Sequence, residues 1–127
     1  MLTETFRVQK PANGESFRIL DLLGFPVAGA NKFLEHLESC GRSPYTLRSY
    51  AVGIADFLGW LHHAGIAFDE VTRHVAGRYM SAFGNAPKGG FAGASRVGAK
   101  RQPRTVNHRL SVLASYFSFL IRQDQEA

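Results

Sequence analysis

Acidic residues are missing from a long part of this chain. No Asp or Glu occurs between Glu70 and Asp124, whereas residues 88–109 alone hold six Lys or Arg side chains. Residues 1–41 have four Lys or Arg against five acids, and residues 42–127 have eleven against five, so the net charge of +5 arises entirely downstream. This local excess of positive charge favours an anionic partner, although a solvated basic loop would have the same composition.

Cysteine and long apolar runs are also scarce. The single Cys40 excludes an internal disulfide, and the start "MLTETFRVQK" lacks the apolar run of a signal peptide. The longest apolar stretch, "VLASYFSFLI", has ten residues and two serines, well short of the roughly 18 that suggest a membrane span. We therefore expect a cytoplasmic protein without a membrane segment. Its 127 residues, 45% of them hydrophobic, suffice for one helical core.

The first half of the chain predicts a short hairpin and two helices. Residues 4–9 and 16–21 alternate like two strands around the turn "KPANGE". A first helix is expected to open at Pro26 and stop at Gly41. A second runs from the Ser43-Pro44 pair to Gly65. Its apolar stripe comprises Leu47, Ala51, Ile54, Leu58 and Leu61.

The second half predicts two more helices separated by a long loop. Thr72 is the expected cap of a third helix that ends at Gly84. Residues 84–102, a stretch of 19 that starts with Gly84 itself, contain five glycines, and we expect this loop to be mobile without a ligand. Thr105 is the expected cap of the fourth helix. Its predicted inward stripe is Val106, Leu110, Leu113, Phe117 and Leu120, and a second apolar face carries Val112, Tyr116 and Phe119.

Several chemical motifs can be discounted. "GASRVGAK" imitates a phosphate-binding P-loop but has Ala99 before the lysine and Arg101 after it. His62 and His63 are adjacent, so on a helix they point about 100° apart and do not form a metal-binding pair. Cys40 has no paired base in the sequence and reads as a small buried or half-buried residue. We find no acid–base constellation.

Two predicted helix starts share an unusual composition. The segments "GRSPYTLRSY" and "KRQPRTVNHRL" combine Arg with Ser, Thr, Tyr or Asn, the side chains that bond to phosphates and base edges. A helix N-terminus carries about half a positive charge, so the cations around residues 101–109 oppose the helix dipole. The anion that would offset them is absent from the sequence, and nucleic acid is the candidate.

The order of these motifs resembles a known family. "SPYTLRSYAVGIADFLGWLHHAGIAFDEVT", a loop, and then "TVNHRLSVLASYFSFLI" look like the N-terminal core-binding domain of tyrosine recombinases, the phage-integrase family. The resemblance covers residues 27–123 and includes Ser43, Thr46 and Tyr50 in an S-x-x-T-x-x-x-Y pattern. It implies an all-α fold, a compact four-helix SAM-like bundle over residues 26–127, preceded by an extension over residues 1–25.

The family resemblance also implies a function. Its members clamp one face of double-stranded DNA while a separate C-terminal catalytic domain attacks a phosphate with a tyrosine, without metal or nucleotide cofactor. The catalytic His-x-x-Arg motif is absent here, so we expect no enzyme activity from this chain, which would act with the catalytic domain of a parent protein and with other recombinase subunits. Alone, it is expected to be monomeric. The candidate DNA-binding residues are Arg42, Ser43, Thr46, Arg48, Tyr50, Lys88, Arg96, Lys100, Arg101, Arg104, Thr105, Asn107, His108 and Arg109.

Two alternatives fit the same residues. One is a stand-alone helical regulator or accessory protein that binds DNA and never had a catalytic domain. The other is a protein-interaction bundle whose basic loop is merely solvated. DNA binding at low salt separates the second alternative from the other two readings.

Overall fold

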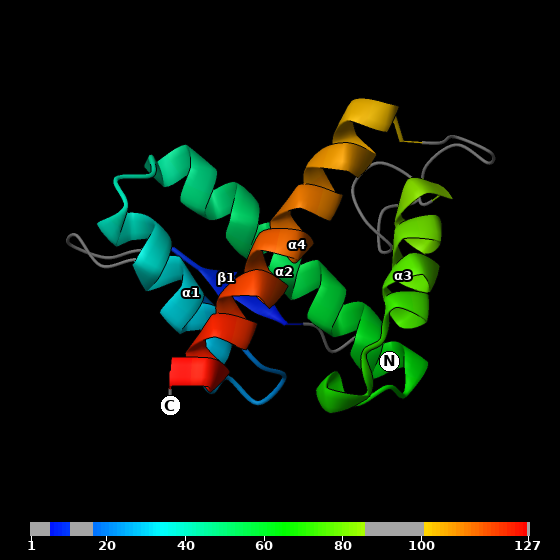
Figure 1. Ribbon diagram of the computed structural model, residues 1–127, viewed down its shortest axis with the longest axis horizontal. Helices are drawn as coiled ribbons and strands as arrows, with labels where there is room; N and C mark the ends of the chain where they lie inside the picture. The colour runs from blue at the N-terminus through cyan, green and yellow to red at the C-terminus, as the bar shows by residue number, and fades with distance from the viewer. Residues whose placement is uncertain (1–5, 11–16, 86–100, 127) are drawn as a thin grey trace. The chain divides into compact units, whose positions relative to one another are not determined.

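The computed structural model shows a short hairpin followed by four helices (Figure 1). It describes residues 6–10, 17–85 and 101–126, with the side chains of residues 125 and 126 excluded. The elements are β1 (Arg7–Gln9), β2 (Arg18–Leu20), α1 (Ala28–Ser39), α2 (Pro44–Ala64), the 3₁₀ turn η1 (Phe68–Glu70), α3 (Arg73–Asn85) and α4 (Pro103–Glu126). The predicted fold class, an all-α bundle with an N-terminal hairpin, is confirmed.

These elements form two compact units. Residues 1–59 and 112–127 make up unit 1, and residues 60–111 make up unit 2. Most of α2 and the second half of α4 thus belong to unit 1, while α3 and the start of α4 belong to unit 2. The separation of residues 1–25 from residues 26–127 stays a prediction.

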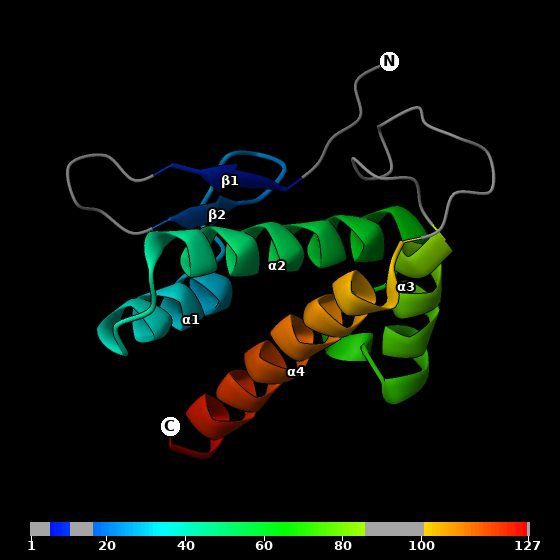
Figure 2. The same ribbon diagram turned by 90° about the horizontal axis from the view of Figure 1, so that it is seen from above.

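The hairpin begins unit 1. β1 and β2 pair antiparallel, with Val8 opposite Ile19, and Figure 2 shows the two strands side by side. Ile19 is completely buried, and β2 contacts α1. The alternation of the sequence therefore indicated both strands correctly, although each is shorter than predicted.

Helix α1 starts later than the sequence predicts. Pro26 forms a bridge with Leu20, and the Val27 N–H donates to the Ile19 carbonyl at 2.9 Å. The chain is therefore still extended beside β2 at Pro26, and the helix begins at Ala28. Its end agrees with the prediction, because Gly41 has a φ of +84°. There the Gly41 N–H donates to the Glu38 carbonyl at 3.0 Å, as in a Schellman motif.

Helix α2 has the boundaries that the sequence predicts. The Thr46 N–H donates to the Ser43 hydroxyl at 3.2 Å, which caps the start. Gly65, with a φ of +73°, follows the last residue. All five residues of the predicted stripe are buried: Leu47, Ala51, Ile54, Leu58 and Leu61.

Aromatic rings form the centre of the unit 1 core. The Phe33 ring of α1 lies 5.6 Å from Tyr116 and 5.3 Å from Phe119, both on α4, and 6.0 Å from Tyr50 on α2. The buried residues of α4 are Val112, Leu113, Tyr116 and Phe119.

The α4 stripe is a correction to the sequence analysis. Val112, Tyr116 and Phe119 of the predicted second face are all buried. Of the predicted inward stripe, Leu113 is buried but Leu110 is 51% exposed. Both faces have apolar residues at helical spacing, so periodicity alone does not predict which face is the more buried.

Unit 2 is built around α3. The Val75 N–H donates to the Thr72 hydroxyl at 3.2 Å, so Thr72 caps this helix as predicted. Tyr79 and Phe83 are buried, and the Tyr79 ring meets that of Trp60 edge-on at 5.5 Å. Gly84 was expected to end α3, but the helix continues through it to Asn85. A glycine with ordinary helical angles lowers helix propensity without stopping the helix.

Candidate nucleic-acid interface

Helix α4 begins two residues before the predicted cap. Pro103 is its first residue, and the Val106 N–H donates to the Gln102 carbonyl at 3.1 Å. Proline suits a first helical position because its fixed φ is helical and its missing N–H would be unpaired there. Thr105 is therefore in the third position and exposed, and the prediction that it is the N-cap is wrong.

The first turn of α4, which the structure describes completely, contains no acid. The same holds for the first turns of α1, α2 and α3. Arg104 instead places a cation in the first turn of α4. The folded chain therefore does place cations near the positive end of the α4 dipole, as the sequence predicts. The contacts that offset this repulsion differ from one cation to the next.

Arg101 offsets the repulsion by donating hydrogen bonds to the end of the preceding helix, α3. Its Nε–H donates to the Phe83 carbonyl at 3.0 Å, and its backbone N–H donates to the Gly84 carbonyl at 2.9 Å. Figures 1 and 2 show the last turn of α3 beside the start of α4. The C-terminal end of a helix is its negative end, so Arg101 gains at α3 the interaction that it lacks at α4.

Arg109 is held by aromatic residues of α3. Its Nη1–H donates to the Tyr79 hydroxyl at 2.6 Å, and its guanidinium carbon lies 4.1 Å from the centre of the Phe83 ring. The guanidinium carbon of Arg101 lies 4.2 Å from the same ring centre. Both arginines are half-buried. Both arginines belong to the predicted cationic site, but nothing in the sequence around them indicates that one phenylalanine joins them.

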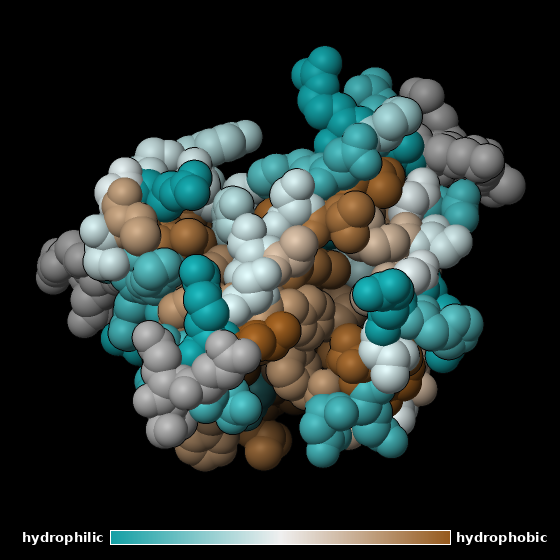
Figure 3. All heavy atoms as spheres, viewed as in Figure 1, coloured by the Kyte–Doolittle hydropathy of each residue, from teal (hydrophilic) through white to brown (hydrophobic). Residues whose placement is uncertain are grey.

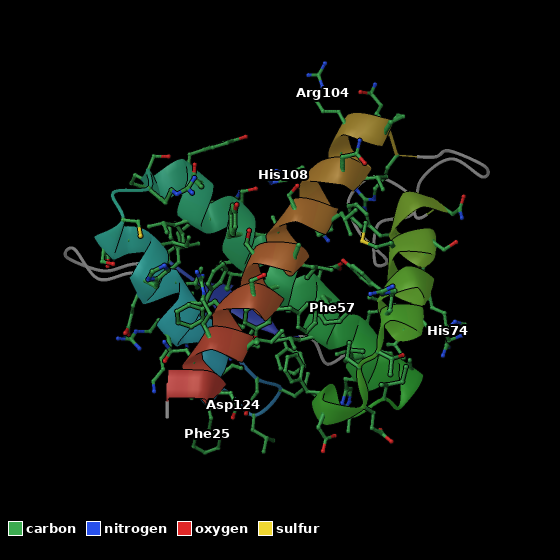
Figure 4. The ribbon with its side chains drawn as sticks, in the orientation of Figure 1. Phe25, Phe57, His74, Arg104, His108 and Asp124 are labelled. Atoms are coloured by element: carbon green, nitrogen blue, oxygen red, sulfur yellow. The ribbon has the colours of Figure 1, made fainter. Side chains whose placement is uncertain are left out.

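The remaining predicted residues of this helix start face solvent. Arg104, Thr105, Asn107 and His108 are exposed. Figure 4 shows Arg104 projecting from the first turn of α4 and His108 one turn further along. Their spacing of four residues places both on one helix face. Figure 3 shows hydrophilic side chains covering this part of α4.

The start of α2 in unit 1 carries the other predicted group. Arg42, Ser43 and Arg48 are exposed, and Thr46 and Tyr50 are half-buried. The Ser43 hydroxyl donates to that of Thr46 at 3.1 Å. Tyr50 is tied to the core through its contact with the Phe33 ring, so its role is at least partly structural.

Two residues near α2 differ from the sequence analysis or extend it. Tyr45, outside the predicted set, exposes 82% of its surface. Cys40 is exposed, which corrects the expectation of a buried or half-buried residue, and its Sγ lies 3.7 Å from the Nε2 of His36. It follows the last turn of α1, where the side chain faces away from the core.

Part of the predicted interface lies outside the described residues. This applies to Lys88, Arg96 and Lys100, and to the loop that the sequence predicts to be mobile. Within the described ranges, no three His, Cys, Asp or Glu side chains gather as a metal site. No described helix has the length and apolarity to cross a membrane.

The fold places the chain among the all-α SAM-like helical domains. Residues 30–124 match the family model of the phage integrase N-terminal SAM-like domain. The chain therefore belongs to this family, as its sequence motifs indicated. The comparisons with curated proteins and with solved structures gave no match. By its family description, this is an integrase N-terminal domain.

Proposed function

We propose that this chain is the DNA-binding N-terminal domain of a tyrosine recombinase and clamps one face of the recombination-site DNA. The observation that carries the proposal is the start of α4, where Arg104 and His108 are exposed on one face and the first turn has no acid. A positive side chain such as Arg104 at a helix N-terminus suits a phosphate backbone, which supplies the negative charge that this helix start lacks.

Different residues of the two helix starts would have different roles. Exposed arginines, including Arg42, Arg48 and Arg104, would bond to phosphates and set the orientation on the duplex. Asn107 and His108, which face solvent on α4, would reach base edges in the major groove. The hydroxyls of Ser43 and Thr105 would add phosphate bonds, and the predicted cations Lys88, Arg96 and Lys100 would extend the contact. Tyr50 and Thr46 would support the start of α2.

The chemical step would belong elsewhere. A separate C-terminal catalytic domain of the same parent would cleave and rejoin the strands through a phosphotyrosyl intermediate, and other recombinase subunits would share the DNA. The chain itself would act by binding, without a cofactor, in the cytoplasm, and as a monomer in the absence of DNA.

Fluorescence anisotropy with a labelled random-sequence duplex tests the proposal. Affinity should fall steeply with salt, and Arg104→Ala should lower the magnitude of the slope of log K against log[salt] by about 0.9, the value for one phosphate contact. Arg73→Ala is the matched control, because Arg73 is also exposed, in the same unit and in a first helical turn, but is outside the proposed interface. A chain that shows no binding at low salt and tens of micromolar protein is instead a protein-interaction bundle.

A further inference from the structure

Phe83 joins the two half-buried arginines of the α4 start. Its ring lies within 4.2 Å of the guanidinium carbons of Arg101 and Arg109, and its carbonyl accepts the Nε–H of Arg101. Phe83 and Tyr79 are almost completely buried, with exposed fractions of 1% and 0%. The two cations are therefore attached to buried side chains of unit 2.

We propose that Arg101 and Arg109 are positioning residues that fix the first turns of α4 on α3, and that the exposed Arg104 contacts the DNA. This inference rests on the proposed function and divides its cations into two kinds. A guanidinium stacked on a ring and bonded to the protein has part of its donor set occupied, whereas an exposed side chain can adapt to a phosphate.

The hydrogen bonds of the two arginines support this division. Arg109 donates to the buried Tyr79 hydroxyl at 2.6 Å, a short bond with a charged donor, which is the strong class of protein hydrogen bond. The Arg101 guanidinium donates its Nε–H to the Phe83 carbonyl at the end of α3 at 3.0 Å. Moving either guanidinium to a phosphate would leave a buried oxygen without this donor and would remove a cation from the Phe83 ring.

The helix dipoles favour the same arrangement. At the start of α4 a cation is repelled by the dipole, and at the end of α3 it is attracted. Arg101 is close to the start of α4 and to the end of α3, so the two dipoles together favour a position toward the α3 carbonyls. Arg104 instead lies exposed in the first turn of α4.

Tyr79→Phe provides the sharpest test because it removes the acceptor of Arg109 and leaves every cation in place. If Arg109 is a positioning residue, DNA affinity should fall by about 3- to 10-fold, the value of one ordinary hydrogen bond, while the salt slope stays unchanged. Amide hydrogen exchange of residues 103–109 should become faster. Arg101→Lys, which keeps the charge and removes the Nε donor, should behave in the same way.

A double-mutant cycle completes the test. In the background of Arg109→Met, Tyr79→Phe should have no further effect on affinity, while Arg104→Ala should still lower the slope by about 0.9. The proposal is overturned if Arg109→Met lowers the slope by that amount while Tyr79→Phe has no effect, because Arg109 would then bind a phosphate itself. If Arg109→Met does not fold, Tyr79→Phe and Arg101→Lys alone decide.

The proposed function and this inference fail in different ways. A wild-type chain that does not bind DNA refutes the function. Amide hydrogen exchange then still tests the positioning role. Faster exchange at residues 103–109 in Tyr79→Phe supports the attachment of α4 to α3, and unchanged exchange rejects it.

Discussion

Asn31 holds both backbone groups of Ile19. Its side-chain oxygen accepts the Ile19 N–H at 2.7 Å, and its side-chain nitrogen donates to the Ile19 carbonyl at 3.2 Å. Asn31 is the buried polar residue of the described core, with 5% of its surface exposed. The amide thus extends the hairpin ladder as a strand backbone would, and it attaches α1 to β2.

Replacing this amide should be costly. Asn31→Ala would leave the buried Ile19 N–H without its side-chain acceptor, and we expect a loss of about 2–3 kcal/mol in the free energy of unfolding. Urea unfolding followed by circular dichroism measures it. The control is Asn85→Ala, because the Asn85 amide bonds to the Ser81 carbonyl in an exposed position. Equal losses in the two variants would contradict a special role for Asn31.

Two glycines should respond in opposite directions to alanine. Gly65 has a φ of +73°, so Gly65→Ala should destabilise the protein by about 1–2 kcal/mol. Gly77 is exposed inside α3, and a Cβ there would meet no atom within 4 Å, so Gly77→Ala should stabilise it by about 0.4–1 kcal/mol. Denaturation midpoints of the two variants on either side of the wild-type value are the expected result.

The arginines of α4 should differ in thermal stability. Arg104→Ala removes a cation from a helix N-terminus and should raise stability by about 0.3–1 kcal/mol or leave it unchanged. Arg109→Ala should lower it by about 1–3 kcal/mol, since the bond to Tyr79 and the contact with Phe83 are lost. Melting temperatures that move together would show that the contacts of Arg109 contribute little.

Tyr116 should make the fold sensitive to alkali. Burial raises the pKa of Tyr116 from 10.0 to about 12. Below pH 10 the side chain is neutral in both the folded and the unfolded chain. Above it the unfolded chain ionises first, so stability should fall as pH rises from 10 toward 12, by about 1.4 kcal/mol at pH 11.

Tyr116→Phe checks the origin of this loss. The variant cannot ionise at this position, so its stability should decline less between pH 9 and pH 11 than that of the wild type. Comparing the declines removes any constant effect of the substitution. Parallel declines in the two proteins would assign the alkaline loss to other groups.

Supercoiled plasmid should remain intact in the presence of this chain. The proposed role is binding without strand cleavage, and each of the five histidines lacks an arginine three positions later. Gel electrophoresis after prolonged incubation provides the measurement. Nicking that disappears in Tyr45→Phe or Tyr50→Phe would assign a nucleophile to this chain and refute the proposal.

Local signals in the sequence predicted most boundaries of the fold. Ser43, Thr72, Gly41 and Gly65 act on their own neighbours, through a hydroxyl that caps a helix or a backbone angle that glycine adopts at low cost. Such signals need no knowledge of the rest of the chain. The buried stripe of α2 was predicted correctly for a related reason, since its apolar residues occupy one face.

The errors come from competing or distant interactions. Thr105 is a good cap, but Pro103 fixed an earlier start, and Pro26 remained beside Leu20 instead of opening α1. The inner face of α4 depends on which neighbours it meets. The division of the α4 arginines depends on Phe83, which is 18 residues before Arg101 in the sequence. The residue types predicted a cationic site. Only the tertiary packing shows which arginines are bound to α3.

The Phe33 cluster also bears on the order of events during protein synthesis. Phe33 belongs to α1, but its partner Phe119 lies 86 positions later in the chain. At roughly 5–20 residues per second, a ribosome needs about 4–17 s to join the two. Until then the apolar face of α1 lacks its α4 partners, while unit 2, formed by the continuous residues 60–111, has all of its members. All residues of unit 2 are therefore translated before the α4 partners of Phe33.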